Sequence, residues 1–176
     1  MNATDAELIE DPVRRQRYRF TREGDVLRAE VWVEPGGDVP RHWHPALEER
    51  FEVVEGHVTF WVGREKHPAG PGDRLVAPAR SPHAFKNTGA EVAHLRVEVA
   101  PASRLQEFLE EAAALARAGK YTKRGIPTSF RAACEAADFT ERYRDVTVLT
   151  FPPPALQRLM LAPLARLERR RRAKRS

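Results

Sequence analysis

The sequence has a single cysteine, Cys134, among its 176 residues, which excludes an internal disulfide and favours a reducing compartment. No stretch approaches the roughly 18–20 uninterrupted apolar residues of a membrane-spanning helix. The first residues carry acidic side chains and lack the apolar core of a secretory signal. We therefore expect a cytoplasmic protein.

The sequence also lacks an evenly spread basic charge, although its net charge is +5. Residues 166–176 contain seven basic residues and one acidic residue, so this tail carries +6 and the remaining chain −1. A domain that recognises nucleic acid would carry its basic patch on the folded body. We therefore expect no specific nucleic-acid partner.

Short apolar segments dominate the chain between Tyr18 and Pro101. They are rich in Val, Phe, Trp and Leu and are separated by turns that contain glycine and proline. Several short strands at turn spacing indicate a sandwich or barrel. The expected strands are Val26–Glu34, Arg50–Glu55, Val58–Gly63, Asp73–Ala77, His83–Asn87 and Ala93–Ala100.

After Pro101 the apolar residues change to helical spacing. Ser103 and Gln106 resemble a capping box at the start of a helix that Gly119 can end. A weaker helix is expected over about 128–139, a short apolar run over 146–151, and an amphipathic segment over Ala155–Arg172, kinked at Pro163. We expect three parts: an N-terminal arm (1–17), a β-barrel (18–101) and a helical extension with the basic tail (102–176).

Three histidines and an acid suggest a metal site. Residues two apart on a strand point to the same side, so His42 and His44 can present both imidazoles to one point. An acid a few residues later can return to that point from the next strand, and His83 follows a proline-bounded turn. Neutral imidazole and carboxylate are the donors expected for Mn, Fe, Co, Ni or Zn.

These residues resemble the two conserved motifs of the cupin superfamily. Gly36, His42, His44, Glu49 and Gly56 fit the first motif, and Gly72, Pro78, His83 and Asn87 fit the second. Arg80 stands where the family usually has glycine, which affects the turn before the third histidine. The resemblance covers about residues 25–100. It implies a mainly β fold, the RmlC-like double-stranded β-helix or jelly-roll barrel, here followed by a helical extension.

The resemblance also implies that His42, His44, Glu49 and His83 bind one divalent transition metal. The spacing to Gly56 selects Glu49 rather than Glu48. Phe51 and Phe85, each two residues beyond a proposed ligand, are the candidates to line the pocket.

Two further residues are candidates for substrate contact. Arg41, next to the first ligand, could clamp an anionic substrate at the rim, although an exposed arginine is the commoner outcome. His94 could face the cavity from the last strand of the barrel, or it could be an ordinary strand residue.

The resemblance leaves several functions open. A dioxygenase-like reaction on a small organic molecule is the leading hypothesis; the alternatives are an isomerase or decarboxylase, and a cupin that binds or senses a small molecule without turnover. A homodimer is expected, because single-domain cupins commonly pair. The C-terminal segment could lie on an anionic membrane surface, but we favour packing of its apolar face on its own barrel.

Overall fold

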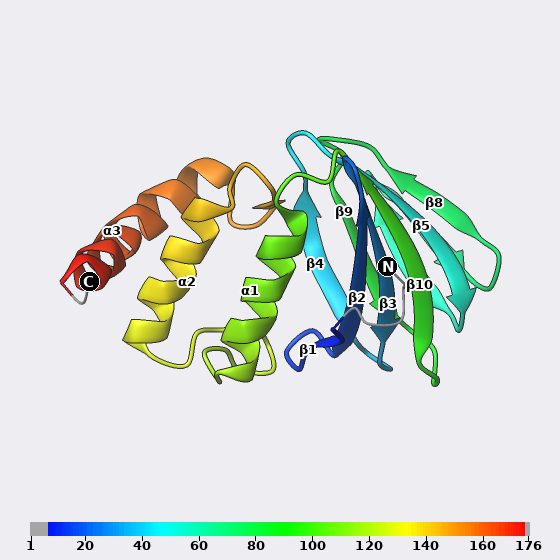
Figure 1. Ribbon diagram of the computed structural model, residues 1–176, viewed down its shortest axis with the longest axis horizontal. Helices are drawn as coiled ribbons and strands as arrows, with labels where there is room; N and C mark the ends of the chain where they lie inside the picture. The colour runs from blue at the N-terminus through cyan, green and yellow to red at the C-terminus, as the bar shows by residue number, and fades with distance from the viewer. Residues whose placement is uncertain (1–6, 175–176) are drawn as a thin grey trace.

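The computed structural model describes residues 7–174 and contains a two-sheet β-barrel beside a group of three helices (Figure 1). The six-stranded sheet has the order β1-β2-β3-β10-β5-β8, and the five-stranded sheet has the order β11-β4-β9-β6-β7. All the strand pairs are antiparallel. The architecture is a jelly roll, as the sequence predicted.

Six of the described strands lie close to the expected positions, and the other five were not among the expected strands. The strands are β1 (Ile9–Asp11), β2 (Gln16–Glu23), β3 (Val26–Val33), β4 (Asp38–Trp43), β5 (Glu48–Glu55), β6 (Val58–Val62), β7 (Glu65–Ala69), β8 (Arg74–Ala77), β9 (His83–Asn87), β10 (Ala93–Ala100) and β11 (Val148–Leu149). Strand β1 lies within the expected arm and pairs with β2, and the arm's residues 1–6 lie outside the described range.

Alternation explains why these segments form half-buried strands. Along β3, Leu27, Ala29, Val31 and Val33 are buried, while the residues between them are partly exposed. The buried side chains of the two sheets form one apolar core with the first helix.

Gly56, the last glycine of the first motif, has a steric reason to be glycine. Its φ is +77°, and a Cβ built there would lie 2.7 Å from the Cα of Ala93. The turn between β5 and β6 therefore passes too close to β10 for any side chain.

The extension forms α1 (Leu105–Arg117), α2 (Phe130–Arg142) and α3 (Pro154–Ala173). Helix α1 lies beside the barrel, α2 beyond it and α3 farthest from it (Figure 1). Gly119 follows the end of α1 with a φ of +68°, as expected of a C′ glycine. The expected capping box is wrong: Arg104 is the N-cap and makes no side-chain cap bond, and Ser103 has a φ of +47°.

The expectation for the C-terminal segment is also corrected. Helix α3 continues through Pro163 and packs on α2 rather than on the barrel. Arg169 and Arg172 lie 3.6 and 3.7 Å from the carboxylate of Asp138, a buried residue of α2. The end of the chain up to Lys174 is therefore partly tied to α2. None of the described helices is long and apolar enough to cross a membrane.

Candidate metal centre and cavity

The structure brings His42, His44, Glu49 and His83 together inside the barrel. One donor atom from each residue lies within 4.8 Å of the donor atoms of the others, and all four residues are buried. His42 lies near the end of β4 and His44 directly after that strand, while Glu49 comes from β5 and His83 from β9. Glu48 points away and accepts a hydrogen bond from Arg50 at 2.8 Å.

Each imidazole is oriented by a main-chain carbonyl at its Nδ1 atom. The partners are Pro40 for His42 at 2.9 Å, Val146 for His44 at 2.8 Å, and Ser81 for His83 at 2.9 Å. A carbonyl can only accept, so each Nδ1 carries a proton and each neutral ring directs the Nε2 lone pair at the common centre. Such outer hydrogen bonds are typical of histidines that bind metals.

The distances between the donors fit a shared cation. Nε2 of His42 lies 3.1 Å from Nε2 of His44, and Nε2 of His83 lies 2.9 Å from Oε2 of Glu49. Two donors bound to one ion at about 2.1 Å are roughly 3.0–3.4 Å apart in octahedral or tetrahedral sites. In the neutral tautomers, the two Nε2 lone pairs would face each other with no proton between them. A divalent ion between them satisfies both.

Burial and neighbouring charges shift the pKa values of three of these residues in different ways. Burial, reinforced by His83 and His44, lowers the pKa of His42 to about 3. Burial also opposes charge on His44, but the Glu49 carboxylate outweighs it and raises the pKa of His44 above its usual value. Burial opposes ionisation of Glu49, yet His44 and His83 hold the pKa of this carboxyl well below its usual range. The ionised form of Glu49 is therefore favoured, and this carboxylate makes His44 more basic than His42.

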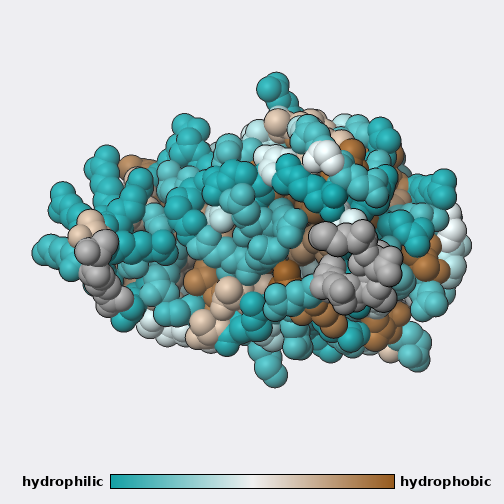
Figure 2. Space-filling model, viewed as in Figure 1, coloured by the Kyte–Doolittle hydropathy of each residue, from teal (hydrophilic) through white to brown (hydrophobic). Residues whose placement is uncertain are grey.

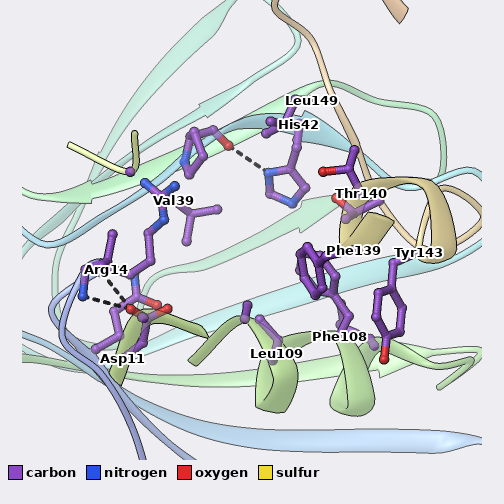
Figure 3. Close-up of a pocket in the computed structure, with 18 of the residues that line it drawn as sticks. Asp11, Arg14, Val39, His42, Phe108, Leu109, Phe139, Thr140, Tyr143 and Leu149 are labelled. Atoms are coloured by element: carbon purple, nitrogen blue, oxygen red, sulfur yellow. Dashed lines mark hydrogen bonds between the residues drawn. The ribbon is translucent and has the colours of Figure 1, made fainter. Parts of the chain in front are cut away.

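A cavity of about 440 Å³ extends from this cluster to the helices. His42, His44 and Glu49 contribute to its wall, together with Phe51 and Phe85, the two residues expected there. The opposite wall comes from the extension, including Leu109 and Phe139. Figure 3 shows His42 and Leu149 across the pocket from Phe108 and Leu109. The barrel and the extension therefore enclose the cavity jointly.

The structure places the two candidate substrate contacts, Arg41 and His94, outside the wall of this cavity. The Arg41 guanidinium donates to the carbonyl of Gly63 in the turn after β6. His94 stacks on Trp32 at 4.9 Å and lies 2.5 Å from the Glu30 carboxylate. His94 faces outward because its neighbours on β10, Ala93 and Leu95, are the buried ones.

Arg80 shows how the chain tolerates its departure from the second motif. Its φ is +64°, the left-handed conformation that glycine adopts most easily. Its N–H donates to the carbonyl of His44 at 2.7 Å, so the turn before His83 stays closed over the first ligand pair. The left-handed backbone conformation of this turn therefore explains why the second motif usually has glycine at this position.

Sequence reasoning missed the part of the site that the extension supplies. Val146 lies 102 residues from His44, and β11 pairs Leu149 with His42. A backbone carbonyl leaves no trace in a residue pattern, so no motif could have found Val146. The apolar face of α1 was visible as helical spacing, but that spacing does not reveal a cavity wall.

Comparisons with known proteins agree with the fold. The family model described as "Cupin domain" matches residues 29–99. Polyketide synthase CurC of Streptomyces cyaneus is 32% identical over 69 residues, which cover 39% of this chain and 45% of CurC. The match spans about half the length of the curated relatives.

Two solved structures share the fold. An RmlC-like cupin from Shewanella frigidimarina NCIMB 400 superimposes with a TM-score of 0.54 at 16% identity, covering 60% of this chain and 93% of that chain. The polyketide cyclase RemF from Streptomyces resistomycificus gives a TM-score of 0.50 at 23% identity, covering 58% and 78%. The barrel therefore matches the cupin family model over residues 29–99 and has the fold of these cupins, and its four clustered side chains could hold one metal ion.

Proposed function

We propose that this protein is a metal-dependent cupin that acts on an extended, mainly apolar small molecule carrying several oxygen atoms, of the polyketone or polyphenol kind. One observation carries the proposal: the donor cluster opens into a cavity of about 440 Å³ with a largely apolar wall. A cavity of this size fits a ligand of several fused rings or its open-chain precursor.

The residues divide the work between holding an ion and holding a ligand. His42, His44, Glu49 and His83 fit a divalent transition metal, which when bound supplies a Lewis acid for a substrate oxygen. Phe51 and Phe85 offer aromatic faces next to these donors and orient a flat ligand. Helices α1 and α2 cover the opposite side and exclude water.

The character of the wall disfavours small polyanionic substrates. Arg14 is the only arginine or lysine among the described residues that line the cavity. Sugar phosphates and small dicarboxylates are usually held by several arginine or lysine side chains. The partial likeness to a polyketide synthase, CurC, supports a polyketide-type ligand instead.

For the reaction itself, we favour a redox-neutral step, such as ring closure of a polyketone. Dioxygenation is the second candidate, because three histidines and one carboxylate leave a metal position free for O2 beside an apolar chamber. Isomerisation, decarboxylation and binding without turnover use the same donors and remain alternatives. The cytoplasmic location and the homodimer stay predictions, and light scattering tests the dimer.

The decisive experiment is turnover of a panel of polyphenols and poly-β-ketones by protein reconstituted with each candidate metal. Mass spectrometry and an oxygen electrode follow the products. Loss of water without O2 uptake identifies ring closure, and incorporation of O2 identifies a dioxygenase. Binding without a product identifies a sensing module. Binding of sugar phosphates in preference to every aromatic compound would contradict the proposed ligand class.

A further inference from the structure

One end of the cavity differs from the rest of its wall because polar side chains gather there. Asp11 ends β1, Arg14 lies in the turn between β1 and β2, and Tyr121 comes from the loop between α1 and α2. Figure 3 shows Asp11 and Arg14 at the side of the pocket away from Phe139 and Tyr143. None of these residues belongs to the metal cluster.

Asp11 is buried, but only one of its two carboxylate oxygens accepts hydrogen bonds within the described residues. It is 4% exposed, and its Oδ1 accepts hydrogen bonds from the N–H groups of Val13 and Arg14, both at 2.9 Å. Among the residues that the structure describes, its second oxygen has no hydrogen-bond partner. A buried carboxylate oxygen that lines a cavity without a partner is available to accept from a ligand.

Arg14 provides donors at the same end of the cavity. Its guanidinium has five N–H groups, and its one side-chain contact within the described residues is 3.4 Å long, to Asp38. The loop after α1 comes close: a Cβ on Gly125 would lie 3.2 Å from Nη2 of Arg14. Glycine at this point leaves room for the guanidinium under the loop.

The nearby side chains of Gln16 and Tyr18 already make hydrogen bonds within the protein, so they do not compete for a ligand. Gln16 donates from Nε2 to the carbonyl of Asp38 at 2.9 Å, and its Oε1 accepts from the Tyr18 hydroxyl at 2.8 Å. Tyr121 remains: burial raises its pKa to about 12, so its hydroxyl keeps its proton at neutral pH. Within residues 7–174 that hydroxyl has no hydrogen-bond partner.

We propose that Asp11, Arg14 and Tyr121 form a second, polar subsite that recognises a neutral hydroxyl or keto oxygen at the end of the ligand far from the metal. Asp38 pairs with the Arg14 guanidinium, and Asp11 brings a second carboxylate to this end of the cavity, so the local charge disfavours an anion. An acceptor and a donor at the same end of the cavity instead match a phenol or an enol. This inference rests on the proposed function and adds that the ligand carries oxygen at both ends.

Strand β4 sets the separation between the two ends. Asp38, which holds Gln16 and Arg14, begins the strand, and His42 lies four residues later. Four strand residues span at most about 13 Å, because the register of β4 on β9 shifts between Val39 and His42. The subsite therefore favours an elongated ligand of about three linearly fused rings, with one oxygen pair for the metal and another oxygen at the far ring.

Two dyes test the inference on the full-length, metal-loaded protein. Alizarin has three fused rings and an oxygen pair at one end, and flavopurpurin differs from it by one more hydroxyl on the far ring. Absorbance titration gives both affinities for the wild type, Arg14→Gln, and Asp11→Asn, which keeps the Oδ1 acceptor of the turn. The control is Arg124→Gln. Arg124 is an exposed arginine of the loop between α1 and α2, which also carries Tyr121, and it lies outside the cavity wall.

The subsite predicts that wild type binds flavopurpurin about tenfold more tightly than alizarin, because a hydrogen bond to a charged group contributes on the order of 1.5 kcal/mol. Arg14→Gln and Asp11→Asn should each remove most of that preference and leave alizarin binding and metal content unchanged, while Arg124→Gln keeps the preference. Equal binding of both dyes by wild type, or a preference that survives both substitutions, overturns the subsite alone. Failure of both dyes to bind the metal-loaded wild type contradicts the proposed function.

Discussion

His44 donates its Nδ1 proton to the main-chain carbonyl of Val146 at 2.8 Å, although 102 residues separate them in the sequence. The carbonyl belongs to the segment that leads into β11, and β11 pairs with β4, the strand that carries His42. The helical extension is thus part of the outer shell of the metal centre as well as a wall of the cavity.

This connection predicts that loosening β11 weakens metal binding. The N–H of Thr150 donates to the carbonyl of Arg41 at 3.1 Å, and its hydroxyl contacts the same oxygen at 3.2 Å. Thr150→Pro removes the N–H and should lower metal affinity about tenfold, the usual size of such outer-shell effects. Calorimetric titration with Zn²⁺ measures it.

The matched variant is Thr150→Val, which keeps the N–H and loses only the hydroxyl. It should bind metal within a few-fold of wild type, and circular dichroism should show the same β content in both variants. Wild-type affinity in a folded Thr150→Pro protein would show that the extension does not orient His44.

The pH dependence of metal binding should reflect His44 rather than His42. His42 has a pKa lowered to about 3 and is already neutral at neutral pH, whereas Glu49 raises the pKa of His44. Metal competes with the proton on His44, so affinity should fall as pH drops through that raised pKa and level off above it. Calorimetric titration at several pH values measures this dependence. An affinity for metal that stays constant down to the pKa of His42 would contradict this assignment.

Arg80 should cost stability that glycine would restore. A left-handed φ costs an ordinary residue about 1–2 kcal/mol, and the greater freedom of glycine in the unfolded chain offsets part of this. Arg80→Gly should therefore raise the free energy of unfolding by up to about 1 kcal/mol. Arg64→Gly, in an exposed turn without positive φ, should lower it. Urea denaturation compares the two, and destabilisation by Arg80→Gly would refute the conformational explanation.

The basic tail predicts salt-sensitive, nonspecific binding to polyanions. Hydrophilic side chains cover the end of the molecule formed by α3 (Figure 2). Arg166 and Arg170 are exposed, whereas Arg169 is an ion-pair partner of Asp138. Reversing Arg166 and Arg170 to Glu should lower the salt concentration that elutes the protein from heparin, without loss of metal. Truncation after Leu164 would be a poorer test, because it also removes contacts of α3 with α2.

The barrel and the donor cluster could be predicted from the sequence because both are local. Alternation along β3 fixes which residues point inward, and the two-residue spacing of His42 and His44 places them on one side of their strand. The same alternation, applied to Ala93 and Leu95, would have placed His94 outside.

The rest depends on contacts between distant segments. Ordinary helical spacing around Phe108 and Phe139 does not say whether these rings fill a core or line a cavity. Arg14 had no motif to mark it, since its role depends on a loop more than 100 residues away that contains Gly125. The sequence therefore predicted the candidate metal ligands and the two phenylalanines beside them, but not the residues that the extension contributes to the cavity wall.

Metal content of the His44→Ala variant tests the central claim most directly. Elemental analysis of protein purified without added metal, followed by titration with Zn²⁺ and Mn²⁺, should show one ion per chain in the wild type and no stoichiometric binding in His44→Ala. His94→Ala is the control, because it removes a histidine with a carboxylate partner on the outer face and should keep the full equivalent. A full equivalent at wild-type affinity in His44→Ala would contradict the metal centre described here.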